Sequence, residues 1–476
     1  MSREVARGSL LGMAGQGWHL VTAFLLYAYL ARALGPTLFG EWTVVLSVLS
    51  WVEIFVASAL VKVTTKALSE SPDEAPHLSR SVYLGQIIVS LVVFLAAQVA
   101  AGPIALALGN VQLTPLIRIA ALDVPLYAVF MAASSIVLGR QRYAKQGVAW
   151  IVYASAKAAF IAGFVWAGLG IQGALVGNAL SSLAGLVAMY SMLGGARERF
   201  SALWPTLRWM VLASMPFLAL SLIQGVAQYV DLWIVSAVVP SAEHVGFYAS
   251  ATVLAEIPVF LFLGLNRVIF PSISSARAQG EGDLADDYTT QSIRTAVIVT
   301  VLAVAFIAAA GRHVIELIYS AAFLRAYLPV ALLMLAGTGR TIHATCAEIL
   351  MARDRRTAAL TLLGVMVVVE GVLVALAARR YGIDGAAAAT ALSMLGGAAV
   401  AVVLLRSSVG WRPLATLVRA LVAAALVGGA LAMLPLSPLT VVIALPVVCI
   451  AYFGLLWILR EFSVRDMAAM RAALGR

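Results

Sequence analysis

The stretch from Gly170 to Gly185 reads GIQGALVGNALSSLAG, and a closely similar stretch, GIDGAAAATALSMLGG, begins 212 residues later at Gly382. Nine of the sixteen positions are identical without a gap, and three of these are glycines. Apolar segments resemble one another through composition alone, but the shared order Gly-Ile-x-Gly-Ala followed by Ala-Leu-Ser-x-Leu-x-Gly is more specific. The chain is therefore predicted to contain two homologous halves. Small residues four apart in both copies predict close helix packing: Gly173 and Gly177, Gly385 and Ala389.

The composition is that of a membrane protein. Hydrophobic residues make up 62% of the chain, charged residues only 11%, and the mean hydropathy is +0.99. A water-soluble chain of this length needs far more charge to cover its surface. The net charge of +10 does not indicate nucleic-acid binding, because the cations lie in short breaks between apolar runs. Cys346 and Cys449 both lie inside apolar runs, so neither a disulfide framework nor a CxxC metal site is expected.

A helix needs about 20 mostly apolar residues to cross the hydrocarbon core of a bilayer. The first apolar run, after Arg3 and Arg7, is too long for a signal-peptide core and is predicted to be retained. The predicted fold is all-α, a polytopic membrane protein of about 14 transmembrane helices. The predicted spans are 9–31, 42–61, 81–102, 116–138, 147–168, 170–193, 209–239, 247–272, 293–311, 327–352, 357–378, 383–405, 413–434 and 438–459.

The distribution of positive charge predicts the orientation. With fourteen spans and the N-terminus in the cytoplasm, 23 of the 32 lysines and arginines fall in inner loops or tails and five in outer loops. Cytoplasmic loops of membrane proteins carry such an excess of Lys and Arg. Removing one span would reverse the bias after that point. We therefore expect both termini to be cytoplasmic.

The repeat extends beyond the opening match and predicts the domain organisation. Residues 138–142 align with 350–354 at the same offset, and residues 39–42 face 245–248 at an offset of 206. Spans one to six thus correspond to spans seven to twelve. An even number of crossings between the copies makes the halves parallel. We expect an N-lobe at 1–200, a C-lobe at 201–412, and two further helices with a cytoplasmic tail at 413–476.

Ionisable side chains inside the predicted spans are the candidate functional residues. Each costs about 2.5–3.5 kcal/mol on insertion scales. The cations are Arg118, Lys157, Arg267 and Arg340, and the acids are Glu53, Asp123, Asp231, Glu256, Glu348 and Glu370. Span seven adds a polar stripe, because Ser221, Gln224, Gln228 and Asp231 are spaced three, four and three residues apart. Such a face is expected to line a water-filled cavity or to contact another polar face.

Two interpretations of these residues stay open. Lys157 and Arg340 lie in the middle of spans, where snorkelling is hardest, and we predict a functional role for both. Arg118 and Arg267 lie near helix ends and could equally reach the interface. The acids either couple to transport or neutralise the cations as buried pairs: Asp231, Glu256, Asp123, Glu53 and Glu370. His19 and His343 are predicted to be packing residues, and no spacing of His, Cys and carboxylates indicates a metal site.

Four motifs resemble one known family. They are LGPTLFG at 34–40, VDLWIV at 230–235, VGFYASA at 245–251 and IFPSIS at 269–274. The chain is similar over essentially all fourteen spans to the flippases of lipid-linked oligosaccharides, such as O-antigen repeat units. These flippases form the polysaccharide-export branch of the MATE-like (MOP) transporter superfamily. In contrast to many drug-exporting relatives, span one has no carboxylate where a coupling cation binds.

The resemblance implies two six-helix lobes around a central cavity, with two extra helices at the C-terminus. It also implies alternating access that moves a polyprenyl-diphosphate-linked glycan to the outer leaflet of the cell inner membrane, for lipopolysaccharide or other surface polysaccharide synthesis. Lys157 and Arg340, with Arg118 and Arg267, would attract the diphosphate. Gln224, Gln228 and Asn178 would hydrogen-bond to sugars.

Other features bound the function. No nucleotide-binding motif is present, so an H⁺, Na⁺ or substrate gradient is expected to supply the energy. No cofactor, metal, enzymatic activity or nucleic-acid partner is expected. The protein is expected to be a monomer, in contact with membrane lipid and with the polysaccharide polymerase machinery.

Two rival functions remain. A multidrug or cation antiporter of the MATE type belongs to the same class and would transport organic cations. A membrane-embedded glycan polymerase, ligase or transferase normally needs a long catalytic outer loop, whereas the outer loops predicted here are short.

Overall fold

The computed structural model of the chain describes residues 3–58, 61, 63–65, 75–193, 203–257, 259, 273, 279, 281–353 and 355–462. Every regular element in these ranges is a helix, and no strand occurs in them. Eleven of the described helices are long and apolar enough to cross a membrane. The predicted all-α, polytopic fold is confirmed.

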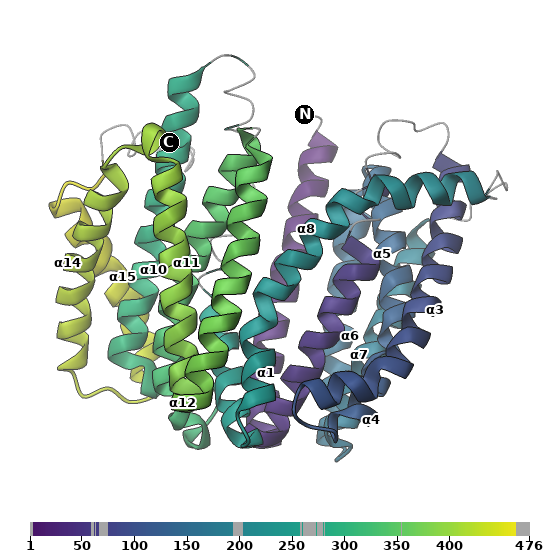
Figure 1. Cartoon of the computed structure of the whole chain (residues 1–476), viewed down its shortest axis with the longest axis horizontal. Coiled ribbons are helices and arrows are strands. Elements are labelled where there is room, and N and C mark those ends of the chain that lie inside the picture. The colour runs from purple at the N-terminus through teal and green to yellow at the C-terminus, as the bar shows by residue number, and fades with distance from the viewer. Residues whose placement is uncertain are drawn as a thin grey trace. The chain divides into compact units, whose positions relative to one another are not determined.

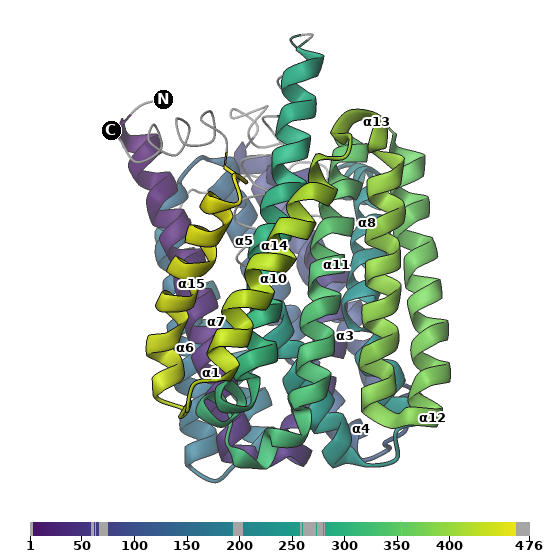
Figure 2. The same ribbon diagram turned by 90° about the vertical axis from the view of Figure 1, so that its left-hand side faces the viewer.

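Two of these eleven segments each contain two helices that form a hairpin. The segments Gly17–Ala57 and Thr357–Leu404 contain 41 and 48 residues. At about 1.5 Å per residue each would be roughly twice as long as the ~30 Å hydrocarbon core. Each is interrupted by a glycine with positive φ, Gly35 (73°) in α1 (Arg3–Glu53) and Gly382 (63°) in α12 (Arg356–Leu404). Glycine adopts this conformation without steric cost, and the two arms of α12 lie side by side in Figure 2.

With each hairpin counted as two crossings, the described residues contain thirteen membrane crossings. The predicted span at 247–272 would be the fourteenth. Its first part, to residue 257, is helical. Its remainder lies outside the described residues apart from position 259.

The contacts divide the chain into two units, Met1–Gly246 and Phe247–Arg476. The first unit (Figure 1) contains α1, the π-helix η1 (Ile54–Ser58), α3 (Ala75–Ala107), α4 (Leu113–Ala120), α5 (Asp123–Gly139), α6 (Tyr143–Trp166), α7 (Gly170–Leu193) and α8 (Leu203–Val238). α6 packs against α1 and α7, and α5 packs against α3 and α7. These contacts bring α1, α5, α6 and α7 around one core.

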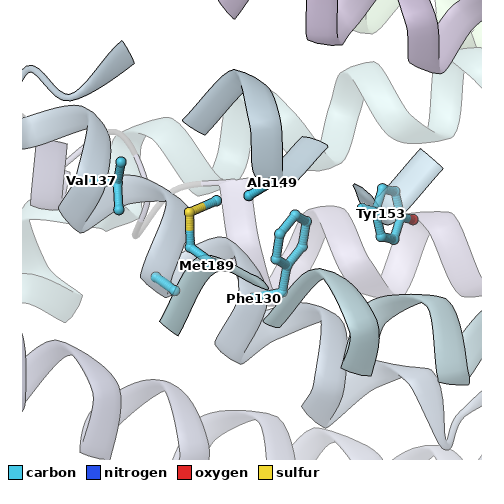
Figure 3. Close-up of a cluster of buried hydrophobic side chains, with 6 residues drawn as sticks. Phe130, Val137, Ala149, Tyr153 and Met189 are labelled. Atoms are coloured by element: carbon cyan, nitrogen blue, oxygen red, sulfur yellow. The ribbon is translucent and has the colours of Figure 1, made fainter. Parts of the chain in front are cut away.

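An aromatic and aliphatic cluster forms part of that core. Phe130, Val137, Ala149, Tyr153 and Met189 are buried together (Figure 3). They come from α5, α6 and α7. The rings of Phe130 and Tyr153 stack with centroids 5.1 Å apart. Such close packing restricts the side-chain conformations of neighbouring residues on the same helices.

The second unit contains most of a helix at 242–257, then α10 (Gly282–Ile318), η3 (Ala321–Ala326), α11 (Tyr327–Ala352), α12, α13 (Arg406–Val409), α14 (Arg412–Ala432) and α15 (Thr440–Ile458). α11 packs along α12, and α10 packs against α11, α14 and α15. Figure 2 shows α14 and α15 beside α10. α14 and α15 line a groove of about 820 Å³ whose walls are almost wholly apolar, so this groove does not suit a charged group.

Both copies of the sequence repeat begin at a turn. Gly170 and Gly382 have φ values of 55° and 63°, and each starts the helix that carries the rest of its copy. Gly177 fulfils the packing role predicted for it, because a Cβ there would lie 2.9 Å from the backbone nitrogen of Ile161 on α6. The two copies therefore have the same local structure.

The helix contacts and the sequence repeat assign α8 to different halves of the chain. α8 packs against α1, α3 and η1, so it belongs to the first unit by its contacts. The lobes at 1–200, 201–412 and 413–476 were derived from the repeat rather than from packing. They stay a prediction.

Candidate functional site

Lys157 lies at the centre of a polar cluster in the first unit. It is one helical turn from Tyr153 on α6, so the two side chains share a face. The Lys157 ammonium donates a hydrogen bond to the Tyr153 hydroxyl at 3.3 Å and lies 5.6 Å from the centre of its ring. Among the described residues, Lys157 forms no ion pair with a carboxylate. An ammonium has three donors, so this one keeps donors available to an anion.

Aromatic neighbours fix the position of Tyr153. Its ring lies 5.1 Å from that of Phe130, 5.5 Å from Trp150 and 5.7 Å from His19, measured between centroids. Figure 3 shows Tyr153 with the surrounding buried side chains. His19, predicted to be a packing residue, packs against Trp150 and Tyr153.

Two carboxyl groups lie on the same side of the cluster. Asp123 is the first residue of α5 and is 1% exposed, and Glu53 is the last residue of α1. The two carboxyl groups lie beside one another, and both interact electrostatically with Lys157. The N-terminus of α5 also favours negative charge at Asp123. The acids thus form a charge cluster with Lys157.

Asn178 joins this cluster rather than standing alone. It is 2% exposed on α7, and its side-chain amide donates a hydrogen bond to Asp123 Oδ2 at 2.5 Å. This hydrogen bond uses the Asn178 side-chain amide within the protein. The sugar contact expected for Asn178 stays a prediction.

The polar stripe on α8 has two kinds of member. Gln224 and Gln228 are exposed, whereas Ser221 and Asp231 are buried. Asp231 accepts a hydrogen bond from the backbone N–H of Leu232 at 2.8 Å. The two glutamine amides are therefore the members of the stripe that a polar ligand could reach.

Arg340 in the second unit differs from Lys157 because it has an acidic partner. It lies on α11 and forms an ion pair with Glu256 on the 242–257 helix. Their side chains are 22% and 19% exposed. Glu256 therefore neutralises a cation, which is one of the two roles predicted for the acids. Glu370 on α12 and His343 on α11 are buried in the same unit.

Arg118 does not join either of these clusters. Arg118 is exposed in the last turn of α4, where its backbone carbonyl accepts a hydrogen bond from Gln98 at 3.0 Å. Arg267 lies outside the described residues. Within the described ranges, no group of three or more His, Cys, Asp or Glu residues could hold a metal ion.

Sequence reasoning missed two members of the first cluster, Tyr153 and Ser182. The spacing of four between Tyr153 and Lys157 is a signal that could have identified the first. Ser182 is fully buried on α7, one turn after Asn178, and lies near both Asp123 and Tyr153. A single serine in an apolar span carries no signal of its own.

Helices of this number and arrangement define a multi-pass membrane protein with the fold of flippases and transporters. The chain is similar to the structure of the lipid II flippase MurJ in an inward closed conformation, with a TM-score of 0.77, 13% identity and coverage of 97% of this chain and 100% of that one. It is also similar to a multidrug resistance MATE family transporter of the MOP superfamily in an inward-facing conformation. There the TM-score is 0.71, the identity 14% and the coverage 82% of this chain and 94% of that one.

A match between the sequence and a known protein family identifies the family of this chain. Residues 5–277, more than half of the chain, match the family described as polysaccharide biosynthesis protein. The chain belongs to this family, and the predicted resemblance to the polysaccharide-export branch of the MATE-like superfamily is confirmed. No curated protein matches the sequence.

Proposed function

We propose that this protein is a flippase that moves a polyprenyl-diphosphate-linked oligosaccharide from the cytoplasmic to the outer leaflet of the cell inner membrane. Transport of this substrate needs no bond to be made or broken, so no catalytic group is required. The membership in the polysaccharide biosynthesis family supports a glycan substrate. The similar structures include a lipid II flippase and a multidrug resistance transporter, and they support transport as the activity.

The observation that carries this proposal is the environment of Lys157. A diphosphate cannot cross hydrocarbon unless cations compensate its charge. The Lys157 ammonium is partly buried on a membrane helix and bonded directly only to a neutral hydroxyl among the described residues. It can therefore donate to phosphate oxygens without first breaking an ion pair.

Arg340 is the proposed counterpart from the second unit. Its guanidinium must exchange Glu256 for the diphosphate, or share itself between them, since both are anionic. Five donors in a planar fork make such sharing possible. Gln224 and Gln228 are exposed on α8 and are proposed to contact sugar hydroxyls.

Alternating access is proposed as the mechanism, with the lipid tail remaining in the bilayer. We propose that both termini are cytoplasmic, as the distribution of lysine and arginine predicts. The coupling ion, H⁺ or Na⁺, and a contact with the polymerase machinery are further parts of the proposal.

The test is a flipping assay in proteoliposomes with a polyprenyl-diphosphate oligosaccharide. We expect Lys157→Ala to abolish flipping and Lys157→Arg to retain part of it, because both cations attract phosphate. Lys145→Ala is the matched control: Lys145 lies on the same helix but is exposed and donates to the backbone carbonyl of Met192. Transport of organic cations without flipping would instead support the MATE-type antiporter.

A further inference from the structure

Two exposed arginines and an exposed tryptophan lie together at one end of the second unit. There α13 turns the chain from α12 into α14, and Figure 2 shows α13 at the end of the unit where α14 begins. The guanidinium of Arg406 lies 5.7 Å from the centre of the Trp411 ring, within the range of a cation–π contact. Arg412 follows Trp411 directly, and its side chain is 74% exposed. Two guanidinium groups are therefore presented on the same turn.

Buried apolar side chains hold this turn in place. Leu405 and Val409 are almost completely buried, and α13 packs against α10 and α12. Gly410, with a φ of 58°, connects α13 directly to α14. Because the apolar side of α13 is buried, Arg406 and Trp411 are left on the exposed side. The cations are thus carried by packed helices.

The protein neutralises neither of these two guanidinium groups fully. Among the described residues, Arg406 forms no ion pair with a carboxylate. Arg412 lies 3.6 Å from Asp287 on α10, whose side chain is 59% exposed, and an exposed pair of this kind contributes little. In contrast, Arg419 further along α14 donates to the buried Glu461 carboxylate at 2.8 Å. Arg406 and Arg412 therefore keep donors available to an external anion.

An exposed apolar stripe runs along α14 from this turn. Its members are spaced three or four residues apart, so they lie on one face of the helix, and each is more than half exposed: Trp411, Leu414, Val418 and Leu421. No charged residue follows Arg419 on this helix. Tryptophan is enriched where the hydrocarbon of a bilayer meets the headgroups. The stripe suits an acyl chain, and the arginines above it suit a headgroup.

We infer that Arg406, Trp411 and Arg412 form a binding site for the phosphate of one anionic glycerophospholipid. Arginine binds phosphate through parallel N–H donors. The distribution of lysine and arginine predicts that this end of the unit is cytoplasmic, where basic residues attract anionic lipids. Two cations favour a headgroup with a net negative charge over a zwitterionic one, whose own cation they repel. The inference concerns a lipid of the bilayer and does not depend on the proposed function.

Asp287 gives this inference a signed consequence. Its carboxylate competes with the lipid phosphate for the guanidinium of Arg412. Asp287→Asn is therefore expected to tighten lipid binding, whereas Arg412→Gln is expected to weaken it. A variant that merely misfolds would weaken binding in both cases.

The experiment titrates the purified full-length protein with phosphatidylglycerol and measures the bound lipid by native mass spectrometry, with phosphatidylcholine as the zwitterionic comparison. The double variant Arg406→Gln, Arg412→Gln should weaken phosphatidylglycerol binding by about tenfold or more, because two cations near the membrane surface are lost. Its binding of phosphatidylcholine should not change. Replacing both arginines by lysine should retain part of the affinity. Arg142→Gln, Lys145→Gln is the matched control, since it removes two exposed cations at the start of α6 and should leave the affinity unchanged.

Soluble glycerophosphoglycerol distinguishes a lipid site from a site for a free phosphate compound. It carries the same headgroup without acyl chains, so it should compete with phosphatidylglycerol only weakly. The inference is overturned if it competes as well as the whole lipid, or if the double glutamine variant binds phosphatidylglycerol as tightly as the unmodified protein. Equal weakening in the control variant, or weaker binding in Asp287→Asn, would also overturn it. Because no flipping is measured, a failure of the flippase proposal leaves this result unaffected.

Discussion

The guanidinium of Arg294 on α10 holds Glu461, just beyond the end of α15, by three hydrogen bonds. Nε and Nη2 donate to the carboxylate Oε1 at 3.0 and 2.8 Å, and Nη2 also donates to the Glu461 backbone carbonyl at 2.6 Å. Arg419 donates to Oε2 at 2.8 Å, and the Thr416 hydroxyl donates to Oε1. The Glu461 side chain is fully buried. One carboxylate thus joins α10, α14 and the end of α15.

This network predicts a loss of stability in acid. Burial alone would raise the pKa of Glu461, but the hydrogen bonds from Thr416, Arg419 and Arg294 outweigh it and hold the pKa below its ordinary value. The ionised carboxylate therefore stabilises the folded state above the ordinary glutamate pKa of about 4.3. That stabilisation is lost as the pH falls through the lower folded-state pKa. Thermal unfolding followed in detergent between neutral and acid pH measures this dependence.

Glu461→Gln should remove the acid dependence and lower the unfolding free energy by roughly 1–3 kcal/mol at neutral pH, because a hydrogen-bonded charge is lost. Asp287→Asn is the control. Asp287 lies 3.6 Å from Arg412, and both side chains are largely exposed, so the pair contributes little. An unchanged acid profile in Glu461→Gln would contradict the assignment of the titrating group.

A second prediction concerns the contact between Gly246 and the turn after Gly35. A Cβ at Gly246 would lie 1.9 Å from the carbonyl oxygen of Pro36, and one at Gly40 would lie 2.6 Å from the Cα of Gly246. Backbone atoms cannot move aside as a side chain can. Gly246→Ala is therefore expected to destabilise the protein by about 1–3 kcal/mol, seen as less folded protein after extraction. Gly163→Ala, on α6 with no atom within 4 Å, should be tolerated.

A third prediction concerns topology. In a variant whose native Cys346 and Cys449 are replaced, Ala144→Cys in the first turn of α6 should react only with membrane-permeant thiol reagents in intact cells. Glu243→Cys, next to Gly246, should react with impermeant reagents as well. The opposite pattern would reverse the proposed orientation. Equal labelling of both positions would contradict the number of spans between them.

The sequence predicted the fold well because its signals are local. Apolar length locates membrane helices, and the structure then shows that Gly170 and Gly382, at the starts of the two predicted spans, adopt positive φ. The hairpin within α12 was visible as two adjacent spans for the same reason. The arrangement of α8 was not, because homology to the other half says nothing about which helices it packs against.

The candidate site was predicted only in part. Ionisable residues in apolar spans are conspicuous, so Lys157, Asp123, Glu53, Arg340 and Glu256 were all identified from composition. Which of them meet depends on helix rotation and tertiary packing. The pairing of Asn178 with Asp123 joins residues 55 positions apart, and no periodicity within either helix indicates it.

The last prediction distinguishes the role of Arg340 from that of Lys157. Arg340→Ala leaves the Glu256 carboxylate without the ion pair that it has in the structure, so part of its effect will be loss of stability. The double variant Arg340→Ala, Glu256→Gln removes both charges and should recover most of the folded protein. Its export of surface glycan should nevertheless stay low, because the diphosphate has lost a cation. Lys157→Ala breaks no ion pair among the described residues, because the Lys157 ammonium is hydrogen-bonded to the neutral Tyr153 hydroxyl.

Export is measured as surface glycan in cells, normalised to protein in the membrane. Arg340→Lys should retain part of the activity, because an ammonium also attracts phosphate, although it loses the bidentate geometry. Glu256→Gln alone should reduce export less than Arg340→Ala, because the acid only holds the cation in place. Full recovery of export in the double variant would show that Arg340 serves the fold and not the substrate. Normal export in both Lys157→Ala and Arg340→Ala would exclude the proposed diphosphate site altogether.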